Sequence, residues 1–183
     1  MAAFPIASPM TADEFIRVYG DDEDDRHELI DGTVCERTVT GYSHDRVKNN
    51  LKTLFDRSGV DRLGFECWIE HSFRLANSSV MTPDVAIIRM ERLEHRTGNS
   101  ATTGAPEIPI EVAISDQPWA LQGKISAYIA NGAHAVCCVY PNLRKIVVYT
   151  AHEWRELTGK DKLELPDLLP GIGIPVSDIF EGV

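Results

Sequence analysis

Apolar and polar residues follow two different rhythms along this chain. In three segments the apolar residues recur every three or four positions, which is the spacing of one face of a helix. The segments begin near Thr11, Ser43 and Pro118, and their apolar positions are Phe15, Ile16, Val18 and Tyr19, then Val47, Leu51, Leu54 and Phe55, then Leu121, Ile125, Tyr128 and Ile129. We therefore expect three helices.

Residues near the ends of these segments support the three helices. Thr11 and Glu14 have the spacing of a capping box, and Ser43 can cap the second helix with its hydroxyl. Pro118 suits the first turn of the third helix, and Gly132 suits its end. Five acidic residues at 21–25 follow the first helix. We expect them to form a solvated loop, with a cation site as the alternative.

Short runs rich in Val and Ile predict strands in the rest of the chain. Asp31-Gly32 separates residues 27–30 from 33–38, which is typical of a type I′ hairpin. Residues 64–75 alternate loosely and predict one or two half-buried strands. The remaining predictions are buried strands at 84–88, 108–114 and 133–140, edge strands at 145–149 and 153–157, a polar loop at 91–106 and a closing segment at 165–180.

The order of these elements defines the fold class. A strand, a helix and a strand between residues 108 and 140 predict a crossover with parallel pairing. We therefore expect an α/β fold whose central mixed sheet is flanked by helices, with an N-terminal helix and hairpin before it. The chain has 183 residues, of which 43% are hydrophobic, and this fits a single domain over residues 1–183.

Composition and charge limit the cellular location and the binding partners that we expect for the protein. No apolar run approaches the roughly 20 residues of a membrane span, and the N-terminus lacks the features of a signal peptide. The four cysteines have no C-x-x-C spacing, and we expect reduced core residues of a cytoplasmic protein. The net charge of −10 argues against a strong non-specific grip on DNA, although a local basic groove can coexist with it.

Two acids stand out against this apolar background. Asp84 opens one predicted strand, and Glu111 lies in the middle of the next, where its neighbours are apolar. A buried carboxylate costs several kcal/mol unless it is paired or binds a metal. Glu111 alone could be a structural acid held by a buried Arg or by backbone donors. A second acid at the start of a neighbouring strand favours a divalent metal site.

This arrangement resembles the PD-(D/E)XK nuclease superfamily, in which Pro-Asp opens one strand and Glu-x-Lys lies on the next. Pro83-Asp84 and Glu111 match, whereas Ala113 occupies the lysine position. The chain is most similar to the Uma-type restriction endonuclease family, which is abundant in bacteria, cyanobacteria among them. The segments that carry this resemblance span nearly the whole chain and are His27–Gly32, His44, Pro83–Ala86, Glu111–Ala113, Lys124 with Tyr128, Leu169–Gly171 and Ile179-Phe180.

The resemblance implies a restriction-endonuclease-like core in which the strand lysine has moved to a helix, as Lys124. Lys124 lies at the edge of the apolar stripe of its helix, so its stem could carry the ammonium toward Glu111. The alternative for Lys124 is a solvated surface lysine. Family members often place an Asp four residues before this lysine, and here that position is Ala120. This departure leaves an inactive copy open.

The resemblance also implies a function. Asp84 and Glu111 would bind Mg²⁺ or Mn²⁺, and Lys124 would orient the attacking water or stabilise developing negative charge. Glu28 and His44 would support the site, although Glu28 could equally be a surface acid of its strand and His44 a structural histidine. We expect a metal-dependent endonuclease that hydrolyses DNA, possible as a homodimer by analogy with restriction enzymes. The alternative is a catalytically inactive nuclease-fold protein that binds DNA or another protein.

Overall fold

The computed structural model describes residues 9–20, 27–37, 41–93, 101–114 and 118–183. Its α-helices are α1 (Ala12–Tyr19), α2 (Tyr42–Ser58), α3 (Pro118–Ala130) and α4 (Val176–Ile179), with short 3₁₀ turns η1 (Val60–Leu63), η2 (Met90–Arg92) and η3 (Pro141–Leu143). Its strands are β1 (His27–Ile30), β2 (Thr33–Glu36), β3 (Phe65–Ile69), β4 (Phe73–Ala76), β5 (Ser79–Met81), β6 (Val85–Arg89), β7 (Thr102–Thr103), β8 (Ile108–Val112), β9 (Val136–Tyr140), β10 (Lys145–Tyr149), β11 (Trp154–Leu157), β12 (Lys162–Glu164) and β13 (Gly173–Pro175).

The larger sheet has the strand order β11-β10-β9-β8-β6-β3. β8 and β9 run parallel and are joined through α3, whereas the other neighbouring strands are antiparallel. The expected mixed central sheet and its crossover are therefore confirmed. Parallel strands cannot be joined by a tight turn, which is why a helix lies between β8 and β9 in the sequence.

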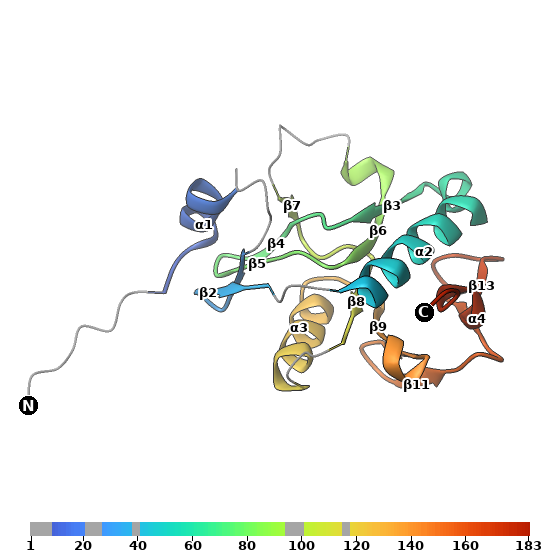
Figure 1. Ribbon diagram of the computed structural model, residues 1–183. Helices are drawn as coiled ribbons and strands as arrows, with labels where there is room; N and C mark the ends of the chain where they lie inside the picture. The colour runs from blue at the N-terminus through green and yellow to red at the C-terminus, as the bar shows by residue number, and fades with distance from the viewer. Residues whose placement is uncertain (1–8, 21–26, 38–40, 94–100, 115–117) are drawn as a thin grey trace, which may run out of the picture.

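The two faces of this sheet pack against different helices. Ile108, Ile110 and Val112 of β8 belong to a core that includes the apolar stripe of α2. Ala113, which follows β8, belongs to a second core with the stripe of α3. Figure 1 shows α2 and α3 apart on their two sides of the sheet. β8 is therefore buried on both faces, as predicted for the strand at 108–114.

The cysteines follow the same alternation. Cys137 lies in the core beneath α2, and its neighbour Cys138 lies in the core beneath α3. All four cysteines are free, and Cys67, Cys137 and Cys138 are buried. Three of the four are therefore core residues as expected, whereas Cys35 is only partly buried.

The smaller sheet has the strand order β2-β1-β5-β4-β7. Asp31 and Gly32 join β1 to β2 with φ values of 48° and 78°, which is the type I′ turn that their residue types predicted. The capping box of Thr11 and Glu14 is also present. Ala12 and Phe15 of α1 pack against this sheet, so the predicted N-terminal helix and hairpin form one unit (Figure 1).

Three local predictions were wrong. Helix α2 begins one residue before Ser43, and its N-cap is Gly41, which has no side chain to accept a hydrogen bond. β10 lies between β9 and β11, so of the two strands predicted at an edge only β11 is at one. The segment expected as a loop at 91–106 contains part of η2 and the strand β7, which pairs in parallel with β4. The acidic run at 21–25 lies outside the described residues.

The C-terminal segment closes the core beneath α2. β12 and β13 form a small antiparallel pair, and α4 follows directly. Val176, Ile179 and Phe180 are buried with the stripe of α2, and the C-terminus lies beside that helix in Figure 1. Among the described residues, no helix has the length and apolar character needed to cross a membrane.

Candidate functional site

The predicted site lies where the two sheets meet. Thr82-Pro83-Asp84 is the short connection between β5 of the smaller sheet and β6 of the larger one. Val85 pairs with Ile110, and one further step of this antiparallel register sets Asp84 opposite Glu111. Glu28 of β1 reaches the same connection, because its Oε1 accepts the backbone N–H of Thr82 at 2.8 Å. The two sheets thus contribute acids to one place.

All three acids are buried. Glu28, Asp84 and Glu111 are 4%, 6% and 4% exposed. Glu28 is therefore not a surface acid of its strand. Because each buried carboxylate needs hydrogen-bond donors or cations to offset its lost hydration, the partners of these acids determine what the site can do.

Asp84 is held by donors on both oxygens. Its Oδ2 accepts the backbone N–H of Val112 at 2.7 Å, and its Oδ1 lies 3.2 Å from His44 Nε2 and 3.3 Å from Arg37 Nη2. Burial alone would raise the pKa of Asp84, but the hydrogen bond and charge of His44, the backbone donor and Arg37 together hold it below its ordinary value. Asp84 is therefore ionised at neutral pH.

His44 connects Asp84 to a row of charges on α2. It lies in the first turn of that helix and is 3% exposed. Its Nδ1 makes no hydrogen bond, although the Asp45 carboxylate lies 3.5 Å away. Lys48 follows, 3.2 Å from Asp45 and 2.7 Å from Glu70. Burial lowers the pKa of His44, but its two carboxylate neighbours raise it further, so the net shift is upward.

Glu111 has a less complete set of partners. Its Oε1 accepts the hydroxyl of Tyr128 at 2.9 Å, and its Oε2 accepts the ammonium of Lys124 at 3.3 Å. Burial raises the pKa of Glu111 to about 7, since the charges of Asp84 and Glu28 add to burial while Lys124 and Tyr128 act against it. Glu111 therefore changes between its protonated and ionised forms near neutral pH.

Lys124 on α3 is the cation shared by two of the acids. Its Nζ lies 2.9 Å from Glu28 and 3.3 Å from Glu111, and its side chain is 17% exposed. Burial lowers the pKa of Lys124, but the charges of Glu111 and Glu28 raise it well above its ordinary value. Lys124 is therefore a half-buried, charged partner of the carboxylates and not a solvated surface lysine.

Sequence reasoning missed three members of this site. Arg37 follows β2 in a stretch without periodicity, so no pattern indicated it. Tyr128 was placed in the apolar stripe of α3 and in the family motif with Lys124 but was given no role at the site, although a buried tyrosine hydroxyl needs a partner. Lys48 was not assigned to the site from the sequence, and it is 9% exposed and paired with Glu70.

The donor set fits a hard divalent cation. Among the described residues, no group of three or more His, Cys, Asp and Glu side chains forms a ready cluster for a metal ion. Mg²⁺ is, however, usually held by one or two carboxylates, with water and substrate phosphates completing the shell. Asp84 and Glu111 lie opposite each other at the register of β6 and β8 and would supply such a pair.

The comparisons with known proteins agree with this geometry. A family model described as "Uma2: Putative restriction endonuclease" matches residues 12–177. The chain belongs to the Uma2 family. The matched range contains every residue of the site, from Glu28 to Tyr128. The resemblance read from the sequence motifs is therefore confirmed at the level of the family.

A solved structure has the same fold as this Uma2 member. It is described as a putative nuclease belonging to DUF820 from Anabaena variabilis ATCC 29413, with a TM-score of 0.81 and 16% sequence identity. The match covers 94% of this chain and 98% of the other. At this identity the likeness shows the fold, and it confirms the restriction-endonuclease-like α/β architecture. No curated protein sequence matches the chain.

Proposed function

We propose that this chain is a metal-dependent endonuclease that hydrolyses phosphodiester bonds of DNA. The observation that carries the proposal is the meeting of Asp84, Glu111 and Lys124, from β6, β8 and α3, in one buried site. Membership of the Uma2 family supports the reaction class. A site built on a rigid sheet and a packed helix holds its groups in place, as catalysis requires.

Each side chain has a role in this proposal. Asp84, kept ionised by His44 and Arg37, and Glu111 would hold Mg²⁺ or Mn²⁺. When bound, that ion would polarise the scissile phosphate and acidify a bound water. Lys124 would stabilise the negative charge that develops on the phosphate oxygens. Glu28 would position Lys124, since its carboxylate lies 2.9 Å from the ammonium.

The proposal is tested by cleavage of plasmid and single-stranded DNA with Mg²⁺ or Mn²⁺. We expect the native chain to cut DNA. Asp84→Ala and Glu111→Ala should each lower the cleavage rate by about 100-fold or more, because each removes a proposed ligand of the metal. Loss of a group that only supports such a ligand already costs about 10- to 100-fold. Asp167→Asn is a matched control, because it removes an exposed carboxylate outside the site. Metal-dependent cutting that survives both site variants would refute the assignment.

An inactive nuclease-fold protein is the second candidate. Ala120 favours it, because the resemblance places an Asp at that position. Calorimetry with Mn²⁺ separates the two candidates. Metal binding that needs Asp84 and Glu111 but gives no cutting of either DNA would support a binding module, and Ala120→Asp would then be the first variant to test for restored cleavage.

A further inference from the structure

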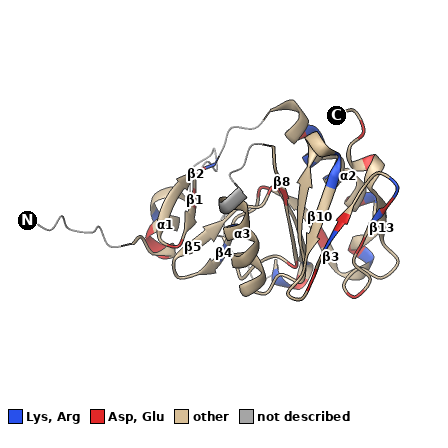
Figure 2. Ribbon diagram, turned by 90° about the horizontal axis from the view of Figure 1, so that it is seen from below, with Lys and Arg blue, Asp and Glu red and all other residues tan. Residues whose placement is uncertain are grey.

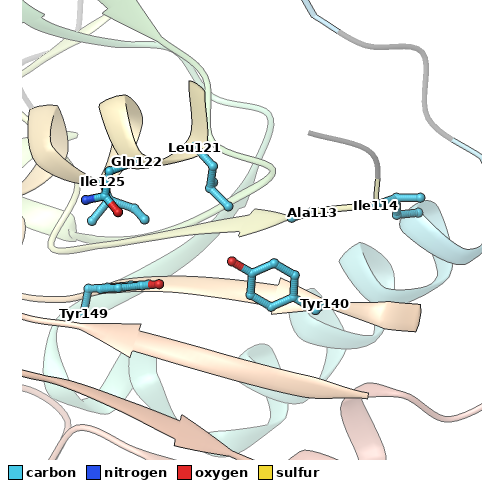
Figure 3. Close-up of a pocket in the computed structure, with 7 residues that line it drawn as sticks. All are labelled: Ala113, Ile114, Leu121, Gln122, Ile125, Tyr140 and Tyr149. Atoms are coloured by element: carbon cyan, nitrogen blue, oxygen red, sulfur yellow. The ribbon is translucent and has the colours of Figure 1, made fainter. Parts of the chain in front are cut away.

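A cavity of about 270 Å³ lies beside the proposed active site, between α3 and the sheet. Figure 3 shows Leu121, Gln122 and Ile125 of α3 on one side of it and the rings of Tyr140 and Tyr149 on the other. Ala113 and Ile114, which follow β8, close the end nearest the site. The cavity is thus lined by apolar groups, two aromatic rings and one amide.

This cavity is continuous with the catalytic face of β8. Ala113 is two residues from Glu111, and residues two apart on an extended strand share a face. Leu121 and Ile125 flank Lys124 on α3. A group in the cavity would therefore lie along the same face of β8 as Glu111 and beside the turn of α3 that carries Lys124. The cavity is smaller than most sites for drug-sized ligands, so it suits one ring system.

The aromatic lining continues outward across the sheet. Tyr149 of β10 pairs directly with Trp154 of β11, and directly opposed residues of antiparallel strands share a face. Trp154 is 66% exposed, although large apolar side chains on an edge strand are usually avoided. Tyr140, Tyr149 and Trp154 together form what we call the aromatic strip, which leads from the cavity to the edge of the sheet.

Charge on this face is balanced. Lys145 lies 5.9 Å from the ring centroid of Tyr140 and forms an ion pair with Glu156 at 2.7 Å. Figure 2 shows Lys, Arg, Asp and Glu scattered together over the described ribbon, with no continuous basic stripe in that view. A partner that binds the strip would therefore gain little from phosphate attraction and most from contact with the rings.

We propose that the cavity and the aromatic strip bind unpaired bases of single-stranded DNA next to the bond that is cut. This inference rests on the proposed nuclease function and specifies its substrate. Bases stack on aromatic side chains in many proteins that bind single strands, whatever the base, because every base has a π face. The cavity takes one base beside the site, and Tyr149 and Trp154 carry the bases that follow.

The test measures DNA binding separately from cleavage. Fluorescence anisotropy of a labelled oligo(dT) of about 12 nucleotides, within the range of single-strand sites, is recorded with EDTA present, for the full chain and its variants. We expect Trp154→Ala and Tyr149→Ala each to weaken binding on the order of tenfold, from the loss of one stacked base. Trp154→Phe keeps a ring and should restore most of the affinity.

Val18→Ala is the matched control, because Val18 is also an exposed apolar residue (59%) but lies on α1, which packs on the smaller sheet. We expect it to leave binding unchanged. Trp154 is mostly exposed, so its truncation leaves the core intact even if Tyr149→Ala destabilises the fold. A native chain that binds a duplex as tightly as the single strand, or equal binding by Trp154→Ala and the native chain, would overturn the inference.

Failure of the nuclease function would look different. Asp84→Ala should still bind oligo(dT) in EDTA, because it leaves the aromatic strip untouched. If the native chain binds oligo(dT) through the aromatic strip but cuts neither plasmid nor single-stranded DNA, the proposed activity is refuted and the binding site is supported. Cutting of duplex DNA that is insensitive to Trp154→Ala would keep the activity and reject the single-strand site.

Discussion

At the scale of single residues, the proposed metal site depends on the protonation of Glu111. A metal ligand must be deprotonated, and burial raises the pKa of this carboxyl to about 7. The apparent affinity for Mg²⁺ or Mn²⁺ should therefore fall about tenfold for each pH unit below 7, as one proton competes with the ion. Calorimetric titration between pH 5 and 8 measures this dependence. A flat affinity over that range would contradict it.

Tyr128 tunes the same carboxyl group. Its hydroxyl donates to Oε1 of Glu111 and so favours the charged form. Tyr128→Phe removes only this donor, and the midpoint of the pH dependence should move above 7. Tyr42→Phe is the matched control, because Tyr42 is 73% exposed. Equal midpoints in the two variants would show that the hydroxyl does not act on Glu111.

Burial of Glu111 also affects stability. Its folded pKa of about 7 lies above its ordinary value of 4.5, so its contribution to folding is largest below pH 4.5 and is lost as the pH rises through 7. The charged form is tolerated at higher pH because Lys124 compensates it. Stability above neutral pH therefore depends on this one lysine.

Lys124→Ala should consequently destabilise the fold more at high pH than at low pH. Removing one partner of a buried ion pair leaves an uncompensated charge and costs about 3 kcal/mol. We expect a cost of this size at pH 8 and a smaller one at pH 5, where Glu111 is protonated, as measured by urea unfolding. Lys145→Ala is the control, since its pair with Glu156 is near the surface and such pairs contribute about 1 kcal/mol or less. Equal costs at both pH values would argue against the pairing.

At the scale of elements, the hairpin of β1 and β2 places Glu28. Gly32 adopts a φ of +78°, and an added Cβ would lie 2.4 Å from the Cβ of Pro9. Gly32→Ala should therefore cost more than about 1 kcal/mol in the free energy of unfolding. Gly123→Ala is the opposite case, because it lies within α3 with no atom within 4 Å of the added Cβ. It should stabilise the fold by about 0.5–1 kcal/mol.

Chemical denaturation of both glycine variants measures the difference. The two changes add the same methyl group, so opposite signs would show that backbone conformation and space decide the outcome. Loss of cleavage in Gly32→Ala at a temperature where it stays folded would further show that the hairpin positions Glu28. A neutral result for Gly32→Ala would refute the strain.

Elements with strong local patterns could be predicted from the sequence. The apolar run at 108–114 predicted the buried strand β8, and Asp31-Gly32 predicted the hairpin, because both signals depend on residues close in the chain. β7 could not be predicted, since its two threonines form a strand only by pairing with β4. Ser43 failed as a cap because α2 begins one residue earlier, at Tyr42, so Ser43 lies inside the first turn.

The residues of the site likewise fall into those that sequence motifs indicated and those that only the fold revealed. Asp84, Glu111 and Lys124 were found because a family pattern joined three motifs that no local rule connects. The fold then added Arg37 and Tyr128, whose contacts depend on chain separated by 47 and 17 positions. A side chain that meets its partner only through tertiary structure leaves little trace in a single sequence. The roles assigned to these residues stay predictions until the variants are measured.

At the scale of the whole molecule, metal binding should stabilise the fold. An ion that binds only the folded state adds about 2.7 kcal/mol at 100 times its Kd. For a chain of this size, that corresponds to a rise in Tm of about 5–10 °C. Differential scanning calorimetry with and without Mn²⁺ measures the shift, and the double variant Asp84→Asn with Glu111→Gln should abolish it. An unchanged Tm in the native chain would argue against a metal site.

The same calorimetry bears on two further expectations. A single domain over residues 1–183 should unfold in one cooperative transition, with equal calorimetric and van't Hoff enthalpies. The homodimer also stays a prediction, and a Tm that rises with protein concentration would support it. The cytoplasmic location expected from the composition also stays a prediction.

The position of the site between the two sheets has a consequence for incomplete chains. Glu28 comes from the smaller sheet and Glu111 from the larger, and Lys124 contacts both. A fragment that lacks either sheet therefore lacks a complete site, however well the rest folds. Under the proposed function, prematurely terminated chains and proteolytic fragments would be harmless to DNA, and cutting would be confined to intact molecules.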